Sequence, residues 1–284
     1  MKSPLGLEAR IPVFELFKDA LFLLWAKRGR LVSMFLPIII VLVVLDHFSS
    51  EIVSSLAASA GVDEQLEVVE FPLEFWFMTA VSIVLSILLA TTVHRFTLMD
   101  ASHWPSNALR IPRAYDWRYL WRFIQIIFIA IAVPIITITV VTLLLGTQVS
   151  PGMSGSSGAS NLIFIIILMF IPYILARLSV TLPEIATGVK GSDLGRAWRM
   201  SRGNGGRLII VVLILPFIVT IPFTVFATLD NVLARVVAAF GAYSMTLISI
   251  TVLSLSYQFL LEFYEPDPEE EVIPEKDDDD GMDA

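Results

Sequence analysis

Six long apolar stretches, separated by polar segments, dominate the pattern of the chain. They lie near residues 31–48, 72–93, 123–145, 162–182, 208–229 and 232–261. A helix of about 20 apolar residues crosses the roughly 30 Å of hydrocarbon in a bilayer. The runs at residues 36–43 and 162–170 are apolar on every side, whereas a surface helix of a soluble protein keeps a polar stripe. The pattern therefore predicts an all-α, polytopic membrane helical bundle with about six transmembrane helices, rather than the buried helices of a soluble protein.

Composition supports the membrane class and excludes the functions that need cysteine. Hydrophobic residues make up 56% of the 284 residues, charged residues only 16%, and the mean hydropathy is +0.78; these values are unusual for soluble domains. The chain has no cysteine, which excludes disulfides, thiol nucleophiles and cysteine-ligated zinc. The net charge of −8 arises largely from acidic residues between Glu265 and Asp280.

Three regions follow from this pattern. Residues 1–30 form a cytoplasmic N-terminal region with an interfacial helix, residues 31–262 form the membrane domain, and residues 263–284 form a disordered acidic tail. The tail is interpreted as a solubilising segment, with docking to a basic partner as the alternative. A cleaved signal is disfavoured, because charges interrupt the first residues and the apolar run from Leu31 ends too far from Ala58 and Ala60.

Lysine and arginine gather in alternate segments, which predicts the orientation. They lie ahead of the first span and in the second and fourth loops, whereas residues 49–71 and 146–161 contain neither. Cytoplasmic loops carry the excess of cations. Both termini are therefore expected in the cytoplasm.

Short amphipathic helices are expected along the cytoplasmic surface, although solvated basic loops are the alternative. Pro12 suits the first turn of one helix, and Ser192 could cap another that carries Leu194 and Trp198. Three units of a leading helix plus two spans would begin near Pro12, Pro112 and Ser192. This suggests a threefold hairpin repeat, although apolar helices also resemble one another by chance.

Arg177 is the strongest candidate for a functional side chain, because a charge inside a span is costly. It lies near the cytoplasmic end of the fourth span, so snorkelling or a structural pair with Glu184 competes with a lipid or phosphate contact. The basic segment that follows supplies the other candidate contacts: Arg196, Arg199, Arg202 and Arg207. Trp198 is a candidate interfacial anchor, and the cluster from Gly203 to Gly206 is expected to end the helix.

Motifs for catalysis are largely absent. His47, His94 and His103 lack metal-ligand spacing, and the glycine cluster lacks the Lys-Ser or Lys-Thr ending of a phosphate loop. We expect no enzyme activity, no metal and no cofactor. Prolines and a few hydroxyl residues interrupt the spans, which leaves transport open as an alternative.

Two segments carry a resemblance to a known family. Residues 177–184 (RLSVTLPE) and 194–204 (LGRAWRMSRGN) resemble uncharacterised bacterial inner-membrane proteins, which are similar to the membrane domain attached to some glycerophosphodiester phosphodiesterases. The resemblance is specific over about thirty residues and diffuse elsewhere. It implies a helical bundle in a bacterial inner membrane. It does not imply phosphodiesterase activity, because catalytic residues of that family lie in a soluble barrel domain that this sequence does not contain.

The sequence thus predicts a non-enzymatic integral membrane protein that binds lipid, organises the membrane or binds a partner. Expected partners are the bilayer, anionic lipid headgroups and another membrane protein, and no nucleic acid is expected. The alternative is a small-molecule or lipid transporter.

Overall fold

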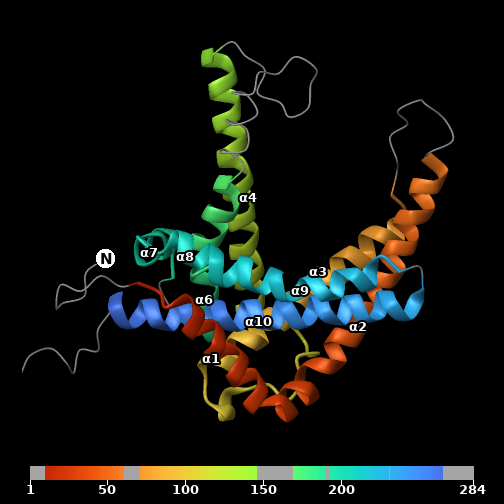
Figure 1. The fold of residues 1–284 in the computed structure, drawn as a ribbon, viewed down its shortest axis with the longest axis horizontal. Coiled ribbons are helices and arrows are strands. Elements are labelled where there is room, and N and C mark those ends of the chain that lie inside the picture. Colours follow the sequence, from red (N-terminus) through yellow and green to blue (C-terminus); the bar gives the residue numbers. More distant parts are fainter. Residues whose placement is uncertain (1–9, 61–70, 146–168, 190–191, 230, 265–284) are drawn as a thin grey trace, which may run out of the picture.

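The computed structural model describes residues 10–60, 71–145, 169–189, 192–229 and 231–264. Within these ranges the chain forms helices and turns but no strand. Six helical segments are long and apolar enough to cross a membrane. The prediction of an all-α, polytopic membrane bundle is therefore confirmed (Figure 1).

The helices follow one another with short connections in the described ranges. They are α1 (Val13–Ala26), α2 (Arg28–Ala60), α3 (Leu73–Leu98), a 3₁₀ turn (Ala101–His103), α4 (Ala114–Leu145), a helix at 169–178, α6 (Thr181–Thr187), α7 (Leu194–Met200), α8 (Gly205–Ile209), a π-helical turn (Ile210–Ile214), α9 (Leu215–Ala227) and α10 (Val232–Tyr264).

The six spans lie close to their expected positions but extend beyond the apolar stretches. They comprise residues 28–56, 73–98, 114–141, 169–187, 205–227 and 232–264. Polar residues at the ends continue the helices, so hydropathy alone places several boundaries too far inside. Residues 162–168 of the expected fourth span, and the tail at 265–284, lie outside the described residues.

Proline accounts for two irregular points. The fourth span turns at residues 179–180 before α6, and Pro183 lacks the N–H that would bond back to this turn. In the fifth span, the π-helical turn at Ile210–Ile214 directly precedes Pro216, which opens α9. A missing backbone donor and the proline ring favour such local adjustments.

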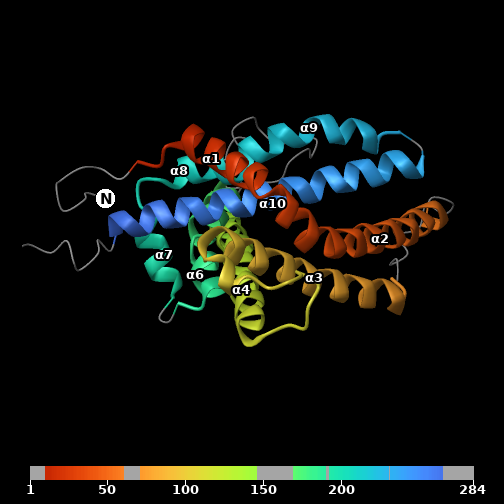
Figure 2. The same ribbon diagram turned by 90° about the horizontal axis from the view of Figure 1, so that it is seen from below.

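Consecutive spans pack in pairs around two central helices. α2 packs against α3, α4 against α6, and α9 against α10, while α10 and α3 also pack against each other. Figures 1 and 2 show α10 running through the middle of the molecule and α4 diverging from the α9–α10 pair. The two spans of each expected hairpin are thus in contact, but α6 also packs against α3, so the threefold hairpin repeat stays a prediction.

The leading helices differ between the units. α1 precedes α2, and α7 precedes the fifth span, as separate helices. In the second unit, no separate leading helix is found: α4 runs without interruption from Ala114 to Leu145. The expected leading helix is instead the first turns of α4, because neither proline nor glycine interrupts the residues between Ala114 and Phe123.

Three of the segments expected at the cytoplasmic surface, α1, α7 and the end of α10, share one core. Ala20 of α1, Met200 of α7, Val211 of the π-helical turn and Tyr257 of α10 belong to the same buried cluster. In Figure 1, α1, α7 and α8 lie where the helices come together, far from the outer ends of α2 and α9. This common core fixes α1 and α7 relative to each other, whereas Ala108 and Tyr119 of the second basic segment belong to other clusters.

Candidate functional site

Arg177 lies inside the protein, with 6% of its surface exposed. Its Nε donates to Ser201 Oγ at 2.9 Å, Nη1 donates to the Tyr173 hydroxyl at 3.3 Å, and Nη2 donates to the Trp198 carbonyl. The guanidinium also lies 3.5 Å from the centre of the Trp198 ring. Arg177 therefore joins the fourth span to α7, and each of its three nitrogens has a protein acceptor.

Glu184 was expected to pair with Arg177, but it forms an ion pair with Arg196. Arg196 Nη1 lies 3.2 Å from Glu184 Oε1, and the two side chains are 13% and 2% exposed. The pair joins α6 to α7. Breaking such a buried pair is costly because one charge then stays inside without its partner.

Asp193 caps α7, one residue after the expected cap at Ser192. Its carboxylate accepts a hydrogen bond from the backbone N–H of Arg196 at 2.7 Å. That bond is the main cause that lowers the pKa of Asp193; desolvation opposes it, and the Gly195 N–H and the attraction of Arg199 and Arg122 support it. Asp193, rather than Ser192, is the residue in extended backbone conformation immediately before the first helical turn.

The remaining arginines of the basic segment have different environments. Arg199 and Arg202 are exposed, and Arg199 Nε donates to the Tyr264 hydroxyl at 3.3 Å. Arg207 Nη1 donates to the Ile11 carbonyl at 2.7 Å, while Asn204 Oδ1 accepts from the Ile11 N–H at 2.9 Å. Arg207 therefore helps to fix the N-terminal segment, whereas Arg199 and Arg202 stay accessible.

The glycines after α7 act as expected in one case and differently in another. Gly203 has φ of +82°, a left-handed conformation that ends a helix and favours glycine. A Cβ on Gly206 would meet nothing within 4 Å, but one on Gly205 would lie 2.4 Å from Tyr173 Cε2. The packing therefore excludes a side chain at Gly205 but not at Gly206. The sequence had not singled out Gly205.

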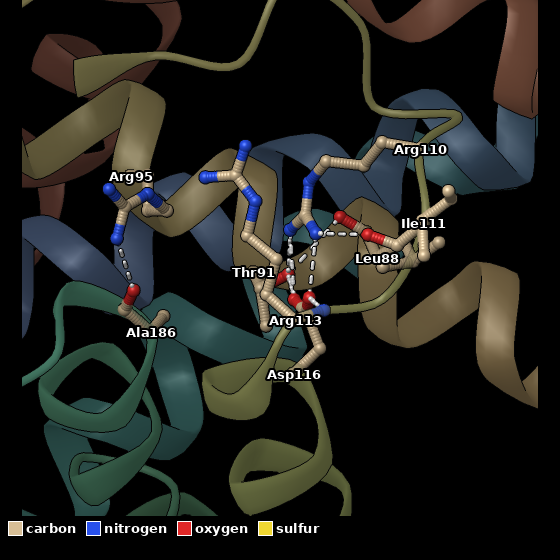
Figure 3. Close-up of polar contacts among 8 residues, drawn as sticks. All are labelled: Leu88, Thr91, Arg95, Arg110, Ile111, Arg113, Asp116 and Ala186. Atoms are coloured by element: carbon tan, nitrogen blue, oxygen red, sulfur yellow. Dashed lines mark hydrogen bonds and ion pairs between the residues drawn. The ribbon is translucent and has the colours of Figure 1, made fainter.

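A second charged cluster, missed in the sequence, surrounds Asp116 at the start of α4 (Figure 3). Arg110 donates to both carboxylate oxygens, at 2.6 and 2.9 Å. The Thr91 hydroxyl donates at 2.6 Å, and the Arg113 backbone N–H donates at 2.7 Å. The last bond is one half of a capping box, in which a residue in the first turn bonds back to the N-cap backbone.

The Asp116 cluster stabilises the connection between α3 and α4. Burial opposes the charge of Arg110, but the hydrogen bond and attraction from Asp116 outweigh it and raise the pKa of Arg110. Arg95 of α3 donates to the Ala186 carbonyl at 3.1 Å and lies over the Tyr115 ring, which Arg110 also contacts. The signal that could have revealed the cluster is an acidic residue three positions after Arg113, where a helix begins.

A buried polar group joins three spans. His94 of α3 is fully buried; its Nδ1 lies 2.7 Å from Ser254 Oγ of α10, and its Nε2 lies 3.2 Å from the Tyr119 hydroxyl of α4. The sequence shows His94 only as an isolated histidine. Its partners are far apart in the chain, so no local pattern indicates them.

These arrangements separate two kinds of cation. Arg110, Arg177, Arg196 and Arg207 are engaged in contacts that hold helices together, whereas Arg113, Arg118, Arg199 and Arg202 are exposed. Exposed guanidinium groups can bind anions such as phosphate. Within the described ranges, no group of three or more His, Asp and Glu side chains is placed to hold a metal ion.

Comparison with protein-family models, with curated proteins and with solved structures gave no match.

Proposed function

We propose that the chain is a non-enzymatic integral membrane protein whose basic face binds anionic lipid headgroups, and which thereby organises lipid or a partner protein. The observation that carries this proposal is the distribution of exposed cations in the described residues. They are Arg10, Lys18, Lys27, Arg28, Arg30, Arg199 and Arg202 on the segments around the common core of α1, α7 and α10, and Arg113 and Arg118 at the start of α4.

Within the described residues, which do not include the acidic tail at 265–284, carboxylates on the same segments do not balance these cations. The exposed ones in the described residues are fewer: Glu15, Asp19, Asp100, Asp193 and Glu262. At the opposite end of the spans, Arg235 forms an ion pair with Glu51 at 2.8 Å. Each Lys or Arg close to an anionic membrane surface contributes about 1 kcal/mol to attraction. The asymmetry therefore favours an anionic surface at the basic face.

α1 supplies the hydrophobic part of this face. Leu16 and Ala20 pack into the core, while Phe14, Phe22 and Trp25 are exposed. An amphipathic helix with exposed aromatic residues favours the boundary between headgroups and acyl chains. α1 is therefore suited to lie along the membrane surface.

The orientation and location are part of the same proposal. The positive-inside bias places the basic face and both termini in the cytoplasm. The resemblance of residues 177–184 and 194–204 to bacterial inner-membrane proteins supports a bacterial inner membrane as the location.

Transport is less well supported, because most buried polar residues of the described spans lie near one end; Thr251, 13 residues before the end of α10, is an exception. Thr91 and His94 lie within eight residues of the end of α3, and Ser254 within about ten of the end of α10. At 1.5 Å per residue, these positions are within about 15 Å of the basic face. Their hydrogen bonds connect helices, which is a packing role.

Lipid retention tests the proposal. The full chain, purified in detergent and offered equal amounts of phosphatidylglycerol and phosphatidylcholine, should retain mainly phosphatidylglycerol in native mass spectrometry. The preference should decrease with added salt, because exposed charges are screened. Equal retention of both lipids would contradict the proposal.

A further inference from the structure

The first turns of α4 and the end of α6 enclose an open hollow of about 500 Å³. Its walls include Trp117, Arg118, Trp121 and Arg122 of α4, together with Val189 and Ser192. Two tryptophans, two arginines and an aliphatic wall form a surface that is both cationic and apolar. None of the described residues that line the hollow is acidic.

The length of the helix places this hollow at headgroup depth. The span that begins at Ala114 has 28 residues, and at 1.5 Å per residue it is about 42 Å long. The hydrocarbon core needs only about 30 Å, so roughly eight residues extend beyond it, and the charged residues Asp116, Arg118 and Arg122 assign this surplus to the first turns. These are the turns that contain Trp117 and Trp121, and tryptophan favours the membrane interface.

The two arginines of the hollow have guanidinium N–H groups that can donate hydrogen bonds to a bound anion. Arg118 is exposed, and Arg122 uses Nη2 to donate to the Ser192 carbonyl at 3.0 Å, which orients its guanidinium. The nearby carboxylate is that of Asp193, which accepts from the Arg196 N–H. Arg118 and Arg122 outnumber this carboxylate, and paired guanidinium groups are suited to phosphate oxygens.

An apolar stripe continues along α4 from the hollow. Ile124, Phe128, Ile131 and Ile135 are exposed, with Phe128 at 71%. Their spacing from Trp121, at three, seven, ten and fourteen residues, keeps them on one face of a helix. From Ile124 to Ile135 the helix rises about 16 Å, close to the thickness of one hydrocarbon leaflet.

We propose that this hollow binds one anionic diacyl phospholipid of the cytoplasmic leaflet, with its phosphate between Arg118 and Arg122 and an acyl chain along the Trp121–Ile135 stripe of α4. The proposal rests on the basic face being a lipid-binding face, and it assigns that binding to a specific site. It moves the principal phosphate contact from the basic segment at residues 196–207 to α4.

The test compares charge removal inside and outside the hollow. Arg118→Gln with Arg122→Gln should lower phosphatidylglycerol retention by the full-length protein about thirtyfold, as expected for the loss of two cations that each contribute about 1 kcal/mol next to an anionic headgroup. The matched control is Arg199→Gln with Arg202→Gln, which removes the same charge from α7 and should lower retention by a clearly smaller factor, because these cations lie outside the hollow. Arg118→Gln alone gives a second variant that leaves the Arg122–Ser192 contact in place.

The outcomes distinguish this site from the general proposal. If the unmodified protein prefers phosphatidylglycerol but both double variants lose it equally, the hollow is not the site although the basic face still binds lipid. If Arg118→Gln alone has no effect, the proposed phosphate position is wrong. Displacement of the lipid by millimolar inorganic phosphate would show a site for soluble phosphate and would also overturn the proposal.

Discussion

Removing the charge of Asp116 should destabilise the protein far more than removing the charge of Glu51. Asp116 pairs with Arg110, and their side chains are only 2% and 11% exposed. Glu51 pairs with Arg235 at a similar distance, but these side chains are 52% and 41% exposed. The chain thus offers two ion pairs with similar N–O distances that differ in burial.

The expected magnitudes follow from that difference. Loss of one partner from a buried pair costs about 3–5 kcal/mol, because the other charge stays buried. An exposed pair contributes about 0.2–1 kcal/mol. Asp116→Asn also weakens the capping bond to the Arg113 N–H and the bond from Thr91, which adds to the loss.

The assay is reversible unfolding in mixed micelles with increasing denaturing detergent. Asp116→Asn should lower the free energy of unfolding by at least about 2 kcal/mol more than Glu51→Gln. A double variant, Asp116→Leu with Arg110→Met, should recover part of the loss because apolar side chains need no charge partner. Equal losses for Asp116→Asn and Glu51→Gln would refute the assignment of Asp116 to a buried, structurally important pair.

Three further predictions concern the segments at the basic face. Gly205→Ala should reduce thermal stability, because its Cβ would lie 2.4 Å from an aromatic ring carbon, whereas Gly206→Ala should not; similar melting temperatures would contradict this. Asn204→Ala should speed hydrogen exchange at the Ile11 amide, because the Asn204 side chain accepts a hydrogen bond from that amide at 2.9 Å. An unchanged exchange rate would show that this hydrogen bond does not hold the N-terminal segment in place. Because the folded-state pKa of Asp193 is lowered, its cap stabilises α7 above the unfolded pKa and loses this effect as pH falls through the folded pKa. In the unmodified protein, the protection of the α7 amides against hydrogen exchange should therefore decrease as the pH falls through the folded-state pKa of Asp193. The Asp193→Asn variant should not show this acid-dependent loss of protection.

The sequence predicts the spans well because bilayer thickness imposes a length and a composition that each apolar stretch displays by itself. It predicts the helix end at Gly203 for a similar reason, since the conformation is local. The boundaries are less accurate, as α4 shows: its first turns are amphipathic but continuous with the span, so the hydropathy change near Phe123 does not mark a helix end.

The contacts of the candidate residues could not be read from the sequence, because they depend on packing between distant segments. The sequence offered Glu184 as a partner for Arg177 on the basis of proximity, yet the fold places Arg196 beside Glu184 and surrounds Arg177 with α7. The partners of His94 lie in α4 and α10 for the same reason. Only the folded arrangement shows which cations are accessible.

Single-cysteine labelling tests the central claim most directly, since the chain has no cysteine of its own. Ser55 lies on the last turns of α2 and Ser106 in the connection between α3 and α4, and both are exposed. With a membrane-impermeant maleimide on sealed spheroplasts, Ser55→Cys should react, whereas Ser106→Cys should react only after the membrane is permeabilised. The opposite pattern would place the basic face outside the cell, and reaction of both before permeabilisation would contradict a chain that spans the membrane between them.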